Sequence, residues 1–266
     1  MNNTAKYTRE EAKEAFANLL DVMDTLRQKC PWDSKQTNQS LKSNTIEEVY
    51  ELVDALSNED DNEICKELGD VLMHVIFYSI FGREKGTFDI VDVCHKVCEK
   101  LKFRHPHIYG NVVAETAEQI EDNWEKIKQK EKDGNKTVLG GVPKTLPTLI
   151  KAYRIQDKVR HVGFDWEKKE QVWDKVKEEI AEFESEVRHM DADKAEQEFG
   201  DVLFSLINAA RLYNINPDNA LERTNRKFIK RFNYLEAKAA KQGSKLKDMT
   251  IAELDKIWEE AKTFDN

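Results

Sequence analysis

The sequence is poor in the residues that interrupt helices and in the patterns that mark membrane proteins. Its 266 residues include only five prolines and ten glycines, with no convincing strand pattern, so an almost wholly helical chain is predicted. A membrane-spanning helix needs roughly 18 consecutive apolar residues, and the best candidate, Val71 to Phe81, is too short. We therefore expect no membrane partner, and we expect this segment to be a buried helix.

Cysteine pairs, a signal peptide and an excess of positive charge are also missing. The four cysteines form no CxxC pair, and residues 1–10 lack the apolar core of a signal peptide, which favours the reducing cytoplasm. The formal net charge is −9, and an acidic chain is repelled by nucleic acid before specific contacts form. A cytoplasmic protein without a nucleic-acid partner is expected.

What the sequence does contain is a series of helical patterns that occurs twice. Apolar spacing predicts helices at about 8–29, 45–57, 63–82, 88–103 and 115–132, and again at 148–161, 172–189, 194–213, 218–242 and 250–262. Residues 133–147 hold three glycines and two prolines and lose this periodicity, which is typical of a linker. We expect an N-terminal domain at 1–132, a linker at 133–147 and a C-terminal domain at 148–266.

The strongest pattern is a set of acidic residues that recurs at a fixed offset of 131 positions. The first set is Glu47, Glu48, Glu51, Glu67 and Asp70, and the second is Glu178, Glu179, Glu182, Glu198 and Asp201. Because all five positions recur at one offset, an internal duplication explains them better than chance.

Each acidic set is suited to binding a cation. Residues three apart on a helix share a face, so Glu48 and Glu51 align on one helix, and Glu67 and Asp70 on the next. If the helices pack antiparallel, the four carboxylates face each other and repel unless cations neutralise them. Ligands that are all oxygen favour magnesium, manganese or calcium. Magnesium is the metabolic default.

Two other interpretations compete with this one. In a chain with 35% charged residues, a single ExxE pair is most often solvated surface or an ordinary ion pair. The duplication argues against that view, as does the position of Glu67 and Asp70 at the start of an apolar segment, where ionised groups are costly. A di-iron site needs Glu-x-x-His pairs on two helices. Since His74 lies four residues after Asp70 and the repeat has Ser205 there, iron is not expected.

Basic and aromatic residues accompany the acidic sets. Lys227 and Arg231 are one helical turn apart, as are Lys100 and Arg104, so each pair can present two cations to one polyphosphate. Trp258 can stack on a base or ribose. Alone, these features are also typical of a basic last helical turn and of a core tryptophan. Beside metal-binding carboxylates they favour a nucleotide.

Together these residues resemble the MazG family of nucleoside triphosphate pyrophosphohydrolases, whose signature is an EExxE helix followed by an ExxD helix. The resemblance covers essentially the full chain and includes Cys30-Pro31-Trp32-Asp33, Arg104-His105-Pro106-His107, Val162-Gly163-Phe164-Asp165-Trp166 and residues 227–232. It implies an all-α fold of tandem MazG domains, a homodimer, and conversion of a nucleoside triphosphate and water to the monophosphate and pyrophosphate.

The resemblance also implies roles for residues of the second repeat, with Mg²⁺ or Mn²⁺ as the cofactor. The implied metal ligands are Glu179, Glu182, Glu198 and Asp201, and the matching, weaker set is Glu48, Glu51, Glu67 and Asp70. Glu178, or a ligand such as Glu179 or Glu182 through its free oxygen, would orient or deprotonate the attacking water. Lys227 and Arg231 would offset phosphate charge. The implied nucleotide contacts are Lys175, Lys194 and Trp258.

The two repeats differ in the cations near their acidic sets. The first has Asn44 and Glu63 where the second has Lys175 and Lys194, so the second repeat is expected to carry most of the turnover. No base-specific pattern is visible, and a broad base range is expected. Two alternatives stay open: a hydrolase for aberrant nucleotides or a guanosine polyphosphate, and a non-catalytic helical module that senses nucleotides or binds a partner.

Overall fold

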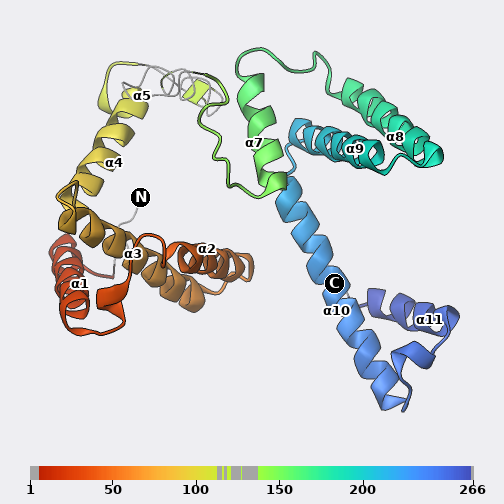
Figure 1. Ribbon diagram of the computed structural model, residues 1–266, viewed down its shortest axis with the longest axis horizontal. Helices are drawn as coiled ribbons and strands as arrows, with labels where there is room; N and C mark the ends of the chain where they lie inside the picture. Colours follow the sequence, from red (N-terminus) through yellow and green to blue (C-terminus); the bar gives the residue numbers. More distant parts are fainter. Residues whose placement is uncertain (1–5, 113–115, 117–118, 121–126, 128–136, 265–266) are drawn as a thin grey trace. The chain divides into compact units, whose positions relative to one another are not determined.

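The computed structural model describes residues 6–112, 116, 119–120, 127 and 137–264. The chain divides into an N-terminal unit, Met1–Ala114, and a C-terminal unit, Glu115–Asn266. Over the described residues every regular element is a helix (Figure 1), which confirms the all-α prediction. None of these helices is both long and apolar enough to cross a membrane. The helix predicted at 115–132 and the start of the predicted linker lie largely outside the described residues.

The N-terminal unit is organised around three helices. Its elements are α1 (Arg9–Lys29), η1 (Asp33–Lys35), α2 (Lys42–Ser57), α3 (Asp61–Glu84), α4 (Ile90–Arg104) and α5 (Pro106–Tyr109). Thr8 and Glu11 form a capping box at the start of α1, which satisfies two backbone N–H groups that the helix itself leaves unpaired. Met23 of α1 packs with Phe77 and Ile80 of α3, and α2 lies alongside α3 (Figure 1).

Helix α2 starts earlier than the predicted bounds of 45–57. The helix begins at Lys42, three residues earlier, and Leu41 occupies the capping position without a side-chain hydrogen bond. Thr45 therefore lies inside the first turn, where its hydroxyl donates to the carbonyl of Leu41 at 2.8 Å. The same oxygen lies 2.6 Å from Nδ1 of His74 and 2.6 Å from the hydroxyl of Tyr78. Thr45 thus joins α2 to α3 instead of starting α2.

The C-terminal unit repeats the helix pair and adds a hairpin. Its elements are α7 (Thr148–Arg160), η2 (Lys169–Gln171), α8 (Val172–His189), α9 (Ala192–Leu212), α10 (Pro217–Lys241), η3 (Leu246–Asp248) and α11 (Ile251–Lys262). Helices α8 and α9 lie side by side, and α11 folds back to contact α10 (Figure 1). Val172 and Val176 of α8 pack against Ala209 of α9. The helix bounds agree with the periodicity to within two residues.

Apolar faces of both helix pairs are left uncovered. The apolar stripe of α2 is exposed at Ile46, Val49 and Val53, and the segment expected to be buried all round is exposed at Leu72 and Val75. On the other helix pair the exposed apolar residues include Ile180, Phe199 and Leu203. Exposed apolar surface of this extent is typical of an interaction site.

Candidate active site

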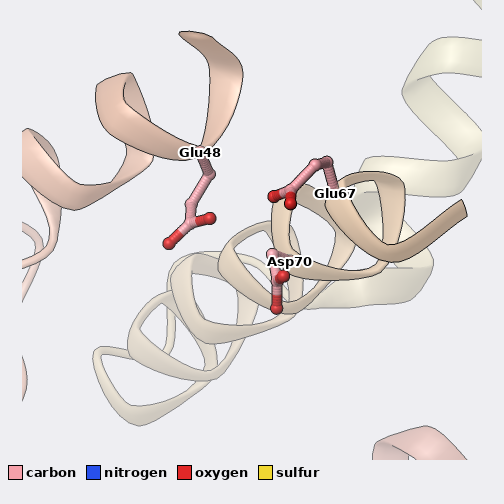
Figure 2. A group of neighbouring side chains, drawn as sticks. All are labelled: Glu48, Glu67 and Asp70. Atoms are coloured by element: carbon pink, nitrogen blue, oxygen red, sulfur yellow. The ribbon is translucent and has the colours of Figure 1, made fainter. Parts of the chain in front are cut away.

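The N-terminal unit brings three of its acidic residues together between α2 and α3. Glu48 projects from α2 toward Glu67 and Asp70 on α3 (Figure 2). One carboxylate oxygen from each residue lies within 4.8 Å of the others. Oxygens on opposite sides of a bound Mg²⁺ are about 4 Å apart, so small side-chain movements suffice to place all three around one cation.

Glu67 is the most buried member of this cluster. It is 3% exposed, and one of its oxygens accepts a hydrogen bond from the ammonium of Lys66 at 2.8 Å. The other oxygen, Oε2, is buried without a hydrogen-bond partner. An unsatisfied buried carboxylate oxygen is costly. A hard cation supplies the missing partner, so this oxygen-only donor set fits a divalent metal such as Mg²⁺.

Burial and neighbouring negative charges raise the pKa values of two carboxyls on α2. Burial raises the pKa of Glu48, and the charges of Asp70, Glu51 and Glu67 raise it further. The pKa of Glu51 is raised mainly by the charge of Glu67. Glu51 is exposed and is not one of the three clustered residues. The cluster thus concentrates negative charge that a cation would relieve.

The C-terminal unit holds a matching cluster built from a different subset of positions. Glu179 and Glu182 on α8 and Glu198 on α9 each place one oxygen within 4.8 Å of the others. Burial raises the pKa of Glu182, and the neighbouring charges of Glu179 and Glu198 add to that rise. Asp201 stands apart from these three, as a wall residue of the adjacent cavity.

Lys175 connects the acidic cluster to this cavity. Its ammonium lies 2.7 Å from Oε1 of Glu179 and 2.8 Å from Oε1 of Glu178, and these two hydrogen bonds raise the pKa of Lys175. The lysine is therefore charged at any physiological pH. It lines the cavity together with Glu179, so a positive group lies between the proposed metal ligands and the open space.

The cavity has a volume of about 510 Å³ and is lined by residues of α7, the loop after it, α8 and α9. Phe164 and Trp166 from the loop contribute aromatic surface, and Ser205 and Asn208 contribute polar groups from α9. This size falls in the range of small-molecule sites, which combine apolar walls with a few polar groups. The space is suited to a flat, polar ligand whose charged end reaches Lys175.

A buried arginine fixes the loop that closes the cavity. Arg211 on α9 is 8% exposed and forms a two-pronged ion pair with Asp165, in which Nη1 donates to Oδ2 at 3.0 Å. Burial alone would raise the pKa of Asp165, but hydrogen bonds from Arg211 and from the backbone N–H of Trp166 outweigh it and lower that pKa. The ion pair holds Phe164 and Trp166 beside the cavity.

The predicted basic and aromatic residues of the hairpin lie elsewhere. Lys227 and Arg231 are on α10 and Trp258 is on α11. The guanidinium of Arg231 stands 5.6 Å from the ring centre of Trp258, and Phe228 packs against the same ring at 5.0 Å. Arg231 and Phe228 of α10 thus contact Trp258 of α11, and neither these residues nor Lys227 are in the lining of the cavity.

Four further predicted residues lie at helix ends or on exposed helix surface. The ammonium of Lys194 lies 3.5 Å from Oδ2 of Asp191, the residue that caps α9. Glu178 is exposed, and its Oε1 accepts a hydrogen bond from Lys175. Lys100 and Arg104 lie in the last turns of α4.

Sequence reasoning missed most of the cavity wall. No sequence motif marks Gln156, Ser205, Asn208 or Arg211 as part of a site, although all four line the cavity. One signal was present: an arginine that follows the apolar run of α9 at a core position needs a buried partner. The partner, Asp165, belongs to the Val162–Trp166 motif, which entered the sequence analysis through the resemblance to the MazG family.

The fold and site together define a class: an all-α protein with two helix pairs, each carrying a carboxylate cluster suited to a divalent cation. The model of the MazG nucleotide pyrophosphohydrolase domain matches residues 36–109 and 167–235, which contain both clusters. The chain therefore belongs to the MazG family.

Relatives over nearly the full length agree with this assignment. The chain is 40% identical to the nucleoside triphosphate pyrophosphohydrolase/pyrophosphatase MazG of Thermotoga maritima, covering 96% of this chain and 99% of the relative. It is 37% identical to the nucleoside triphosphate pyrophosphohydrolase of Escherichia coli K12, covering 92% and 95%. It is also 46% identical to the uncharacterized protein YabN of Bacillus subtilis, covering 93% of this chain and 51% of that protein.

Proposed function

We propose that this protein hydrolyses nucleoside triphosphates between the α and β phosphates, which yields a nucleoside monophosphate and pyrophosphate. The observation that carries the proposal is the carboxylate cluster of the C-terminal unit, which shares Glu179 with a cavity of nucleoside size. Two full-length relatives are named for this activity. A broad range of bases is part of the proposal.

The proposed cofactor is Mg²⁺, with Mn²⁺ as a substitute. Glu179, Glu182, Glu198 and Asp201 would hold it in the C-terminal unit, and Glu48, Glu51, Glu67 and Asp70 would form the second, weaker site. When bound, a divalent cation supplies Lewis-acid chemistry, because it offsets phosphate charge and lowers the pKa of water.

The other steps are assigned to groups of the chain itself. Lys175 lies between the cluster and the cavity, so its ammonium is placed to bind a phosphate oxygen. Glu178 is exposed beside it, and its carboxylate is proposed to accept a proton from the attacking water. Lys194 would bind the phosphates from the first turn of α9. The ring walls of the cavity exclude water from the nucleoside.

We further propose that the protein is a homodimer. The apolar faces around Val49 and Leu72 in the N-terminal unit and around Phe199 and Leu203 in the C-terminal unit flank the acidic clusters and are exposed in the single chain. A second copy would cover them and would offer its α10–α11 hairpin, with Lys227, Arg231 and Trp258, to the site. Light scattering during size-exclusion chromatography tests this proposal, and a monomer at micromolar concentration would contradict it.

We also propose that the protein is a cytoplasmic enzyme of two domains. All four cysteines are free thiols, as expected in a reducing compartment. We retain the proposed linker at 133–147 between domains at 1–132 and 148–266. Limited proteolysis that releases two stable fragments from cleavage at 133–147 would support these boundaries, and cleavage inside α7 would contradict them.

The decisive experiment is product identification. The protein is incubated with single nucleoside triphosphates and Mg²⁺, and the products are separated by ion-exchange chromatography. Monophosphate and pyrophosphate are expected, whereas diphosphate and orthophosphate would overturn the proposal. If no product forms at micromolar protein while nucleotides still bind, the alternative of a nucleotide-sensing module is favoured. The Glu182→Gln variant controls for contaminating activity.

A further inference from the structure

A glutamine in the cavity wall carries an acceptor with no partner. Gln156 on α7 is 4% exposed, and its Nε2 donates to the backbone carbonyl of Phe204 at 2.7 Å. A carbonyl oxygen can only accept, so the amide cannot be turned around and Oε1 is fixed as the free end. This Oε1 is buried without a hydrogen-bond partner. The amide is thus held in the wall of the cavity with its acceptor unsatisfied.

Ser205, one helix away, adds a second acceptor to the same wall. Its hydroxyl donates to the carbonyl of Val202 at 2.9 Å, which uses its only hydrogen and leaves lone pairs on the oxygen. Asn208 differs from Ser205 because it has no free acceptor. Its Oδ1 already accepts two hydrogen bonds from Arg211, at 3.0 and 2.8 Å. Oε1 of Gln156 and the hydroxyl oxygen of Ser205 are therefore suited to accept hydrogen bonds from donors of a ligand.

In the N-terminal unit, larger side chains occupy the positions that correspond to Ser205 and Asn208. At the fixed offset of 131, Ser205 corresponds to His74 and Asn208 to Phe77. His74 is buried and bonded to Thr45, while Phe77 is packed in the core beside Met23. The polar wall is thus a feature of the C-terminal unit and not a general consequence of the helix pair.

We propose that this cavity binds the nucleobase and that Oε1 of Gln156 accepts a hydrogen bond from an exocyclic amino group, so that cytosine and adenine are preferred over uracil and hypoxanthine. The inference rests on the proposed function for the presence of a nucleotide. It adds a graded preference within a broad base range. The phosphates lie toward Lys175 and Glu179, which line the cavity and belong to or contact the acidic cluster.

The exocyclic groups of the compared bases explain why cytosine and adenine are preferred. Uracil and hypoxanthine carry a carbonyl where cytosine and adenine carry the amino group, and two acceptors cannot share a hydrogen bond. The wrong base leaves both the glutamine oxygen and its own carbonyl unpaired after water has been excluded. One such mismatch corresponds to a discrimination of about tenfold.

Steady-state kinetics with matched nucleotide pairs test the proposal. The ratio of kcat/KM is measured for CTP against UTP and for ATP against ITP, and a ratio of about ten is expected for the wild-type protein. In Gln156→Met both ratios should approach one through loss of kcat/KM for CTP and ATP, with UTP and ITP little changed. The matched control, Gln197→Met, alters an exposed glutamine on α9 and should keep the wild-type ratios.

Several results would overturn the proposed role of Gln156 in base preference. Wild-type ratios near one, or a ratio that survives Gln156→Met, would overturn it while leaving the proposed hydrolysis intact. If Gln156→Met fails to fold by circular dichroism, Gln156→Asn replaces it, because the shorter side chain withdraws the acceptor from the base, and an unchanged ratio there would overturn the proposal. If the wild-type protein releases no product, the proposed function fails, and the ratio of Kd values for CTP and UTP from calorimetry decides the base preference.

Discussion

The two units place the same acidic positions in different surroundings. In the N-terminal unit, buried Glu67 is paired with Lys66 on its own helix, and the neighbouring core is filled by His74 and Phe77. In the C-terminal unit, buried Glu179 is paired with Lys175 at the edge of a cavity. A shared set of carboxylates therefore does not make two equal sites. The space beside the carboxylates distinguishes them. The cavity at Lys175 and Glu179 measures about 510 Å³ and has aromatic walls, whereas the hollow at Lys66 and Glu67 measures about 290 Å³ and is lined mostly by acidic residues.

The largest expected difference between the units is in catalysis. Glu182→Gln removes one oxygen donor from the cluster beside the cavity, and pyrophosphate release should fall about 100-fold or more. The matched variant in the other unit, Glu51→Gln, should change the rate of pyrophosphate release by less than about twofold. The described part of that unit has no counterpart of Lys175 or of the polar cavity wall. Pyrophosphate release under saturating Mg²⁺ measures both.

A larger loss of pyrophosphate release from Glu51→Gln than from Glu182→Gln would assign catalysis to the N-terminal unit. Circular dichroism and thermal unfolding serve as the folding control, and both substitutions should leave the spectrum unchanged.

A smaller effect is expected from the lysine that distinguishes the two units. Lys175→Met removes the cation between the cluster and the cavity, and KM for a triphosphate should rise about tenfold because a charge-assisted phosphate contact is lost. The corresponding position in the N-terminal unit is Asn44, which is exposed. Asn44→Met is the matched control and should leave KM unchanged. An effect confined to kcat would place Lys175 outside the phosphate site.

Each unit also uses an arginine to secure the loop near its first helix, and these ion pairs can be compared by stability. Arg27 on α1 pairs with Glu84 and also donates to the carbonyl of Asp33 at 2.7 Å, whereas Arg211 on α9 pairs with Asp165 in the loop. Asp165→Asn should lower the free energy of unfolding by about 1–2 kcal/mol at pH 7. It should also disturb the cavity wall.

The pH dependence of this ion pair has a definite sign. The pKa of Asp165 is lowered in the folded state, so its stabilisation is present above the ordinary pKa of aspartate, near 4, and is lost as the pH falls through the lower folded value. Chemical unfolding of the wild-type protein and of Asp165→Asn should therefore converge in acid. A difference that persists at pH 2 would contradict the role of the charge.

The smallest expected effect is a gain in stability from breaking the N-terminal cluster. The pKa of Glu48 is raised mainly by burial and then by neighbouring carboxylates. Its ionisation therefore destabilises the fold as the pH rises from the ordinary glutamate pKa through the raised one. Without divalent cations at pH 7, Glu48→Gln should raise Tm slightly.

Thermal unfolding measured with and without Mg²⁺ tests this expectation. Adding Mg²⁺ should raise the Tm of the wild-type protein, because a ligand that binds only the folded state stabilises it. The rise should be smaller for Glu48→Gln. An equal rise in both proteins would count against Glu48 as a ligand.

Local patterns in the sequence were sufficient to predict most helices. Helix α8 has the predicted bounds, 172–189, and α1 starts after the Thr8 cap at the predicted place, because periodicity and capping depend on neighbours a few residues away. The predicted start of α2 at residue 45 was wrong for the same reason, because Thr45 lies inside the helix. Its hydroxyl bonds to His74 and Tyr78, which lie 29 and 33 residues further on, and a local rule cannot take such partners into account.

The sequence by itself determined the duplicated acidic positions and the difference in nearby lysines, since both follow from spacing along a helix. Only the tertiary structure decided that Ser205 borders a cavity while His74 fills a core, and that Gln156 keeps an unpaired acceptor in the wall. The physical reason is that a cavity is the space left between side chains from separate helices. Its shape depends on how α7, α8 and α9 pack, and no single segment encodes that packing.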